Sequence, residues 1–160
     1  DSKTGIELLK ILSRQMFNHD LGVFQDVINS SDGIPLNVLN STETSALFLH
    51  AVDNGIFGIK PDMSRDEITI SPKLVECWGE YERFGKLIGE HRLHIKVNRR
   101  HENFVDIVFN FEKRPDMKLN IALPDNIEMM EINKVKYEGN KAVIRPGKNN
   151  RLWGYYRKKN

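Results

Sequence analysis

Cysteine is almost absent from this sequence, whose 160 residues include a single one, Cys77. One thiol cannot close an internal disulfide, and a cysteine-ligated zinc site needs several, so the chain is neither a disulfide scaffold nor a zinc module of that kind. The acidic neighbours Glu76 and Glu80 disfavour the thiolate that a nucleophilic cysteine requires. We therefore expect no cysteine chemistry in this chain.

Long apolar runs are also missing. None approaches the roughly 18 residues that a membrane-spanning helix requires, and the longest one, residues 46–51, is interrupted by His50. At the same time 39% of the residues are apolar and the net charge is only +2, which excludes a solvated, disordered tail. We expect a folded chain without a membrane partner.

The sequence lacks the motifs of several enzyme classes. It has no glycine cluster between a strand and a helix that would cradle a phosphate, and no Gly-x-Ser-x-Gly turn for a serine nucleophile. Its five histidines never form the i, i+4 pair of a zinc protease helix. His91 and His94 lie three apart on an expected strand and therefore on opposite faces. The sequence predicts neither a metal site nor a cofactor.

Positive charge is modest and unevenly distributed. Residues 1–60 contain four Lys and Arg against seven Asp and Glu, whereas residues 61–160 contain 20 against 15. Basic residues of the second part, such as Arg99 and Lys141, alternate with acids, and proteins that bind polyanions carry denser positive patches. Nucleic-acid binding was the alternative for this part, and the charge pattern argues against such a partner.

Helical signals are confined to the first 55 residues. Thr4 and Glu7 form a capping box, which predicts a helix that continues through Phe17 with apolar residues at helical spacing. A cluster of hydroxyl side chains at residues 41–45 predicts the start of a second helix, and Gly55 predicts its end. The sequence therefore predicts two helices near the N-terminus.

The second predicted helix is unusually apolar. Residues 46–52 are apolar on nearly every face, so this helix needs burial on most sides. The chain offers it few helical partners, and a long irregular stretch, residues 18–40, precedes it. We interpret the first part of the chain, residues 1–60, as the terminal helices of a larger helical domain.

After Phe57 the pattern changes to short segments of period two that are separated by turn residues, which is typical of antiparallel strands. Residues 72–87 are ambiguous, and we favour a turn through Trp78 followed by a strand. The predicted fold class is α+β: a short N-terminal helical segment and then an antiparallel, jelly-roll-like β-sandwich over residues 61–160. The other strands are predicted at residues 68–70, 93–97, 104–111, 119–123, 128–137, 142–145 and 152–157.

Two carboxylates and two hydroxyls form the candidate catalytic region. Cleavage of a glycosidic bond requires an acid and a base about 5 to 9.5 Å apart. Asp26 and Glu43 lie in or beside the irregular stretch, near the start of the apolar helix, where Thr42 and Thr44 would line a polar cleft. The simpler interpretation of Glu43 is also open, because the helix dipole favours an acid in the first turn.

Two short elements flank the change of period. The first, Gly-x-x-Gly-Ile-x-Pro-Asp, ends at Asp62, and the second, Ile-x-Pro-x-x-Val-x-x-Trp, ends at Trp78. They resemble the junction in glycoside hydrolases and phosphorylases whose catalytic domain is an (α/α)6 barrel. This group includes α-L-rhamnosidases, amylo-α-1,6-glucosidase-like enzymes and disaccharide phosphorylases. In that group the first element ends the last barrel helix and the second enters a β-sandwich; Val75 departs from the proline that relatives commonly have.

The resemblance implies a function. The chain would be the C-terminal part of a carbohydrate-active enzyme that cleaves glycosidic bonds with two carboxylates, on an oligosaccharide or glycoside substrate. The general acid would lie in the upstream catalytic barrel of the same polypeptide, so this chain alone would be mainly structural and inactive. The base would be Asp26 or Glu43, which lie shortly before or at the start of the last helix.

A sugar-binding module without catalytic activity is the main alternative. Trp153 and Tyr155 lie two residues apart on a predicted strand, so they share one face and would stack on sugar rings, whereas Tyr156 lies on the other face. Trp78 has a second interpretation, as a core anchor at the junction between helix and sandwich. The two functions differ in whether an exposed aromatic platform exists.

Overall fold

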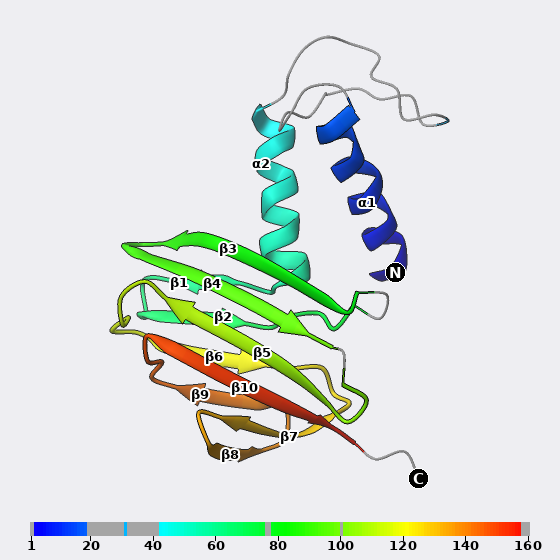
Figure 1. Ribbon diagram of the computed structural model, residues 1–160. Helices are drawn as coiled ribbons and strands as arrows, with labels where there is room; N and C mark the ends of the chain where they lie inside the picture. The colour runs from blue at the N-terminus through cyan, green and yellow to red at the C-terminus, as the bar shows by residue number, and fades with distance from the viewer. Residues whose placement is uncertain (1, 19–30, 32–41, 76–77, 100, 158–160) are drawn as a thin grey trace. The chain divides into compact units, whose positions relative to one another are not determined.

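The computed structural model describes residues 2–18, 31, 42–75, 78–99 and 101–157 (Figure 1). These residues divide into two compact units, Asp1–Val52 and Asp53–Asn160. The first unit holds helices and the second holds all ten strands, which is the predicted α+β fold.

Both predicted helices are present. Helix α1 spans Ser2–Asn18 and helix α2 spans Thr42–Ala51. The second differs at its end, because the chain passes into a π-helical turn, η1 (Val52–Ile56), before the strands begin. No residue of α2 is buried, and its Leu47 is 61% exposed. Asp26 and nearly all of the irregular stretch that we predict at residues 18–40 lie outside the described residues.

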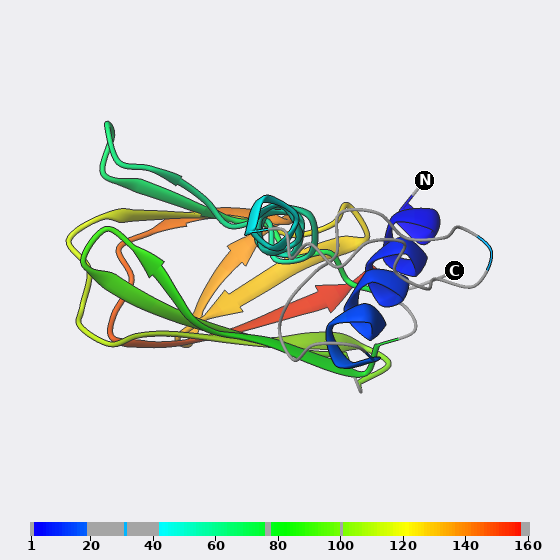
Figure 2. The ribbon, with the colours of Figure 1, turned by 90° about the horizontal axis from the view of Figure 1, so that it is seen from above.

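The strands form two sheets that lie in separate layers (Figure 2). The larger sheet has the order β3-β4-β5-β10-β7-β8 and the smaller has the order β1-β2-β6-β9. The strands of the larger sheet are β3 (Glu80–Ile88), β4 (His91–Asn98), β5 (Phe104–Phe111), β10 (Asn149–Tyr156), β7 (Ile127–Ile132) and β8 (Val135–Glu138). Those of the smaller sheet are β1 (Lys60–Asp62), β2 (Glu67–Ile70), β6 (Lys118–Ala122) and β9 (Lys141–Ile144).

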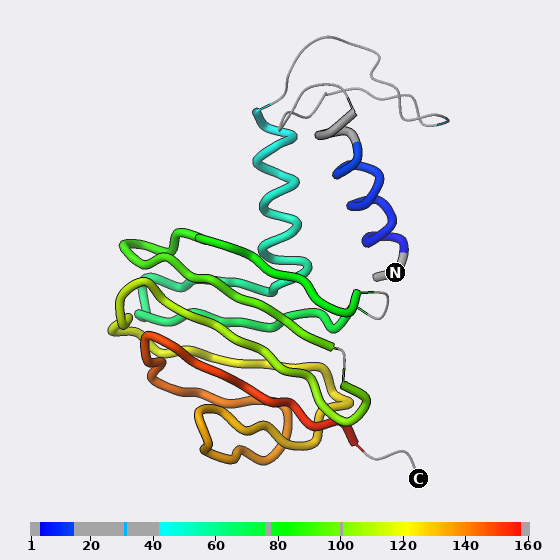
Figure 3. Tube along the Cα trace, in the orientation of Figure 1, coloured from blue at the N-terminus to red at the C-terminus, as the bar shows by residue number. Residues whose placement is uncertain are grey.

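The predicted strands are confirmed with three differences. Strand β1 was not predicted, and residues 128–137 form the hairpin β7–β8 instead of one strand. Asn133 and Lys134 both have positive φ there, as a two-residue hairpin turn requires. The β2–β6 pair is parallel, whereas the other strand pairs within the described residues are antiparallel. The course of the chain through these strands can be followed in Figure 3.

The core lies between the two sheets and follows the period of two. In β4 the alternating residues Leu93, Ile95 and Val97 are completely buried, and the residues between them are partly exposed. Phe109 of β5 and Leu152 of β10 are almost as inaccessible. The opposite, outer face of the larger sheet carries the other side chains of the same strands, and these include aromatic residues.

Candidate functional site

The predicted catalytic region is only partly described. Glu43 and Thr42 are exposed in the first turn of α2, and Thr44 is half-buried beside them. Asp26 lies outside the described residues, and the spacing of the Asp26 and Glu43 carboxylates therefore stays a prediction. An acid in the first turn also suits the positive end of the helix dipole, and both interpretations of Glu43 stay open.

The predicted aromatic platform lies on strand β10. Leu152 and Gly154 of this strand are buried, whereas Arg151, Trp153 and Tyr155 alternate with them and are exposed or half-buried. Since neighbouring residues of a strand point to opposite faces, these three side chains share the outer face of the larger sheet. We call Arg151, Trp153, Tyr155 and the residues opposite them on β5 and β7 the outer aromatic face.

Trp153 lies between two acidic residues of the neighbouring strands. It is directly opposite Asp106 of β5 on one side and Glu131 of β7 on the other. Residues opposite each other in antiparallel strands have Cβ atoms about 4.5 to 5.5 Å apart, so their side chains are in reach of one another. The indole ring is therefore flanked by carboxylate groups on both sides.

Arg151 links these groups. Its Nε and Nη2 atoms donate hydrogen bonds to Oδ1 and Oδ2 of Asp106 at 2.9 and 2.7 Å, which is a bidentate pair. Its guanidinium carbon lies 5.1 Å from the centre of the Trp153 ring, within the range of a cation–π contact. The hydrogen bonds and the charge of Asp106 raise the pKa of Arg151 above its ordinary value. The side chain is thus held in place by an acid and an aromatic ring.

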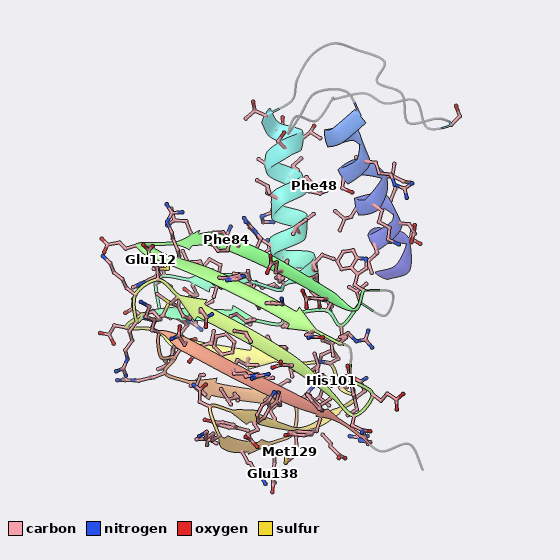
Figure 4. All side chains as sticks on the ribbon, viewed as in Figure 1. Phe48, Phe84, His101, Glu112, Met129 and Glu138 are labelled. Carbon is pink, nitrogen blue, oxygen red and sulfur yellow. The ribbon has the colours of Figure 1, made fainter. Side chains whose placement is uncertain are left out.

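A second aromatic group lies beside the first. Tyr155 is opposite Phe104 of β5 and Met129 of β7, and its ring centre lies 6.0 Å from that of Phe104. The His101 ring stacks on Phe104 at 4.1 Å with an interplanar angle of 14°. Figure 4 labels His101, which precedes β5, and Met129 of β7, and both lie toward the end of the sheet where β10 finishes. Apolar and aromatic side chains therefore extend across three strands.

Four described basic side chains on or near the outer aromatic face have acidic partners. Besides the Arg151–Asp106 pair, the Lys96 ammonium lies 2.8 Å from Glu80. His94 of β4 lies 3.4 Å from Glu82, and Arg92 lies 3.7 Å from Glu112. The basic groups of β4 and β10 are thus matched by carboxylates, which lowers the affinity of the sheet for polyanions.

A second polar cluster lies at the start of the sandwich unit. Asp53 of η1 is only 4% exposed, and its two carboxylate oxygens accept a hydrogen bond from Arg83 Nε at 2.7 Å and pair with Lys86 Nζ at 2.6 Å. Burial raises the pKa of Asp53, but the hydrogen bonds and charges of Arg83 and Lys86 outweigh it and hold that pKa below its ordinary value. The cluster fastens η1 to β3.

The second glycine of the first junction element, Gly58, has a steric role. Gly58 has a φ of +61°, and a Cβ atom on it would overlap the Oγ and backbone oxygen of Ser71. The Ser71 amide donates to the Gly58 carbonyl at 3.2 Å, and the Lys73 amide donates to the Ile56 carbonyl at 2.8 Å. The two elements that the resemblance singled out therefore lie against each other.

Four other residues of these elements also have structural roles. Ile59 and Ile70 are buried in the core, and the Asp62 carboxylate accepts hydrogen bonds from the Ser64 amide and hydroxyl at 3.2 and 2.6 Å. The half-buried Trp78 ring meets the Tyr81 ring edge-on, with centres 5.5 Å apart. This contact agrees with the interpretation of Trp78 as an anchor of the junction.

No protein-family model, curated protein sequence or solved structure matches this chain. Within the described residues no three His, Cys, Asp or Glu side chains gather as a metal site would require. Within that same part of the chain, no helix has the length and apolar character needed to cross a membrane.

The sequence identified two members of the outer aromatic face and missed the others. Trp153 and Tyr155 could be found because they lie two apart on one strand. Asp106 and Phe104 precede them by more than 40 residues and come into position only through the β5–β10 register. The available signal was the alternation within residues 104–111, which places positions 104 and 106 on one face but does not say which strand lies beside them.

Proposed function

We propose that this chain is the C-terminal part of a carbohydrate-active enzyme that cleaves glycosidic bonds with two carboxylates and no cofactor. In this proposal α1 and α2 complete an upstream catalytic (α/α)6 barrel of the same polypeptide, and the sandwich has a mainly structural role. The observation that carries the proposal is α2, a helix that is apolar on most faces and contains no buried residue.

The exposure of α2 has a substantial energetic consequence. Leu47 and Leu49 are 61% and 50% exposed, and full burial of a leucine side chain is worth about 1.5 to 3 kcal/mol. Helix α1 likewise leaves Leu8 and Ile11 exposed. Helices of this kind are stable when further helices cover them. A larger helical body formed by the same polypeptide meets this requirement.

The junction supports the choice of enzyme group. Its glycine, isoleucine, proline and aspartate positions match the group's turn, and three of them have a physical reason in this chain: Gly58 lies against Ser71, Ile59 is buried in the core, and Asp62 accepts hydrogen bonds from Ser64. Structural need alone explains these residues. The choice of a glycosidase therefore depends on the sequence resemblance, and the structure is compatible with it.

The proposal assigns roles to the candidate residues. The general acid lies in the upstream barrel, and the base is Asp26 or Glu43, with Thr42 and Thr44 lining the polar cleft at the start of α2. The substrate is an oligosaccharide or glycoside. The 160-residue chain, which holds at most one of the two carboxylates, is inactive alone.

The test uses the full-length protein encoded by the gene. We expect several hundred residues of helical sequence before Asp1, and glycosidase activity on a panel of aryl glycosides and oligosaccharides. Asp26→Asn or Glu43→Gln should lower kcat by about a hundredfold or more, the range for loss of a general base. Glu7→Gln on the exposed side of α1 is the matched control and should keep full activity. Undiminished kcat in both candidate variants removes the site assignment, and the absence of an upstream helical region removes the proposed function.

A further inference from the structure

We infer that the outer aromatic face is a binding surface for a neutral oligosaccharide, with Trp153 as its central platform. This inference takes its ligand class from the proposed function, but it assigns a binding site outside the catalytic region. The site is built from β5, β10 and β7, which are neighbours in the larger sheet.

Two half-buried aromatic rings lie at a suitable spacing, and because the Arg151 guanidinium lies over one face of the Trp153 ring, a sugar would stack on the other face. Trp153 and Tyr155 are two residues apart on β10, so their Cα atoms are about 7 Å apart along the strand, on the scale of one sugar unit. Phe104 and Met129 flank Tyr155 on the neighbouring strands and extend the apolar area. Aromatic rings with a polar handle suit ligands that combine an apolar face with polar edges, as pyranose rings do.

The polar groups around Trp153 supply both kinds of hydrogen-bonding partner. Asp106 uses its two oxygens to hold Arg151, and this leaves Arg151 three of its five N–H donors. Glu131, opposite Trp153 on β7, supplies acceptors on the other side. A sugar hydroxyl both donates and accepts, so it is matched by a platform with a donor on one side and a carboxylate on the other.

The charge pattern selects neutral ligands. Arg151, Lys96, His94 and Arg92 each have a carboxylate partner within 4 Å. A uronic acid, a sulfated glycan or a nucleic acid would have to displace these carboxylates or lie beside them, and Glu131, which has Lys136 of β8 opposite it, adds a further acid next to Trp153. Neutral sugars face no such repulsion.

Affinity electrophoresis of the 160-residue chain tests the inference. The gels contain hydroxyethyl cellulose, mixed-linkage glucan, starch or galactomannan as neutral probes, and polygalacturonate or heparin as charged ones. We expect retardation by at least one neutral polysaccharide and none by the charged ones at physiological salt. Trp153→Ala should weaken binding about tenfold or more, which corresponds to the loss of one stacking contact.

Two further variants make the outcome specific. Phe84→Ala removes an aromatic side chain that is 75% exposed on β3 of the same sheet, and it should leave retardation unchanged. Glu131→Gln keeps the shape and should weaken binding severalfold, and it replaces Trp153→Ala as the test if that variant does not fold. Folding is checked by the fluorescence of Trp78 and by circular dichroism.

The outcomes separate this inference from the proposed function. No retardation by any neutral probe, or retardation that survives both Trp153→Ala and Glu131→Gln, overturns the binding surface. Retardation by heparin or polygalacturonate alone, abolished by salt, identifies an unspecific polyanion surface and also overturns it. Specific neutral binding in a protein without an upstream hydrolase region would leave the surface intact and remove the proposed enzyme.

Discussion

The helical unit and the sandwich unit differ in whether their own residues close a buried core. Leu47 of α2 is 61% exposed, whereas Leu93 of β4 is completely buried. The sandwich closes its core between its own two sheets, while the described side chains of both helices remain at least partly exposed. Phe84 and Leu87 of β3 stay 75% and 58% exposed on the sandwich surface, but unit Asp53–Asn160 closes a core by itself, whereas the described helix residues close none.

The largest expected effect comes from truncating Leu93, and Leu47 is the comparison. Leu93→Ala should lower the free energy of unfolding of the sandwich by about 3 to 5 kcal/mol, because it leaves a cavity in a closed core. Leu47→Ala should change the stability of the same chain by less than about 0.5 kcal/mol, because its side chain is mostly solvated. Urea unfolding measures both, with tryptophan fluorescence for the sandwich and circular dichroism for the helices.

The full-length protein sharpens this comparison. If an upstream helical body covers α2, Leu47→Ala should there cost about 2 to 5 kcal/mol, as in any core. An equally small effect in both contexts would mean that α2 stays solvated in the full-length protein. This result would contradict the proposal that an upstream helical body covers α2. A small effect of Leu93→Ala would contradict the closed core of the sandwich.

Gly58→Ala should have the next largest effect, about 2 to 4 kcal/mol, measured by the same urea titration. The substitution adds the cost of a left-handed backbone for a residue with a Cβ atom to a steric overlap with Ser71. Gly139→Ala is the matched control, because Gly139 also has positive φ but has no heavy atom within 4 Å of the added Cβ. It should lose only about 1 to 2 kcal/mol, and equal losses would mean that the Ser71 contact has no effect.

Asp53 makes the stability of the sandwich depend on pH. Its folded pKa lies below the ordinary value of 3.8, so its stabilising contribution is complete above that pH and is lost as the pH falls toward the folded pKa. Asp53→Asn should lower stability at neutral pH by about 2 to 3 kcal/mol, because it leaves Arg83 and Lys86 without their carboxylate. The same variant should also flatten the loss of stability below pH 4.

Asp62 is the control for Asp53, because its carboxylate is exposed and its pKa is also lowered. A hydrogen bond from Ser64 is the main cause that lowers the pKa of Asp62. Urea titrations of Asp62→Asn between neutral pH and pH 3 should show a much smaller change than those of Asp53→Asn. Equal pH profiles for the two variants would show that burial of Asp53 contributes little to the acid dependence.

The period of two predicted most of the sandwich, because alternation such as that of residues 93–97 depends only on which side chains face the core. It could not predict the register. The turn of the β7–β8 hairpin, Asn133-Lys134, lacks the Asn-Gly signature of such turns. The parallel β2–β6 pair joins residues that are 51 positions apart, such as Glu67 and Lys118. These features depend on tertiary packing.

The candidate sites likewise contain residues that a local pattern predicts and residues that only strand pairing brings together. Trp153 and Tyr155 were found from their spacing on one strand, whereas Asp106 and Glu131 belong to the outer aromatic face only because β5 and β7 lie on either side of β10. Asp53 was not predicted as part of a cluster, since Arg83 and Lys86 follow it by about 30 residues and share one face only through the irregularity in β3. Long-range pairing is the information that local patterns do not contain.

The smallest expected effect concerns an ion pair on the helical unit. On α1, Lys10 Nζ lies 2.8 Å from Glu7 Oε1 in an exposed i, i+3 arrangement, whereas the two cations on Asp53 act on a buried carboxylate. Lys10→Gln keeps the helix propensity nearly constant and removes the charge, so the helical circular dichroism signal should indicate a loss of less than about 0.5 kcal/mol. The effect should vanish in molar salt, because exposed pairs are screened. A loss comparable to that of Asp53→Asn, or one that persists in salt, would show that this part of α1 is enclosed and that the two units differ less than their exposures indicate.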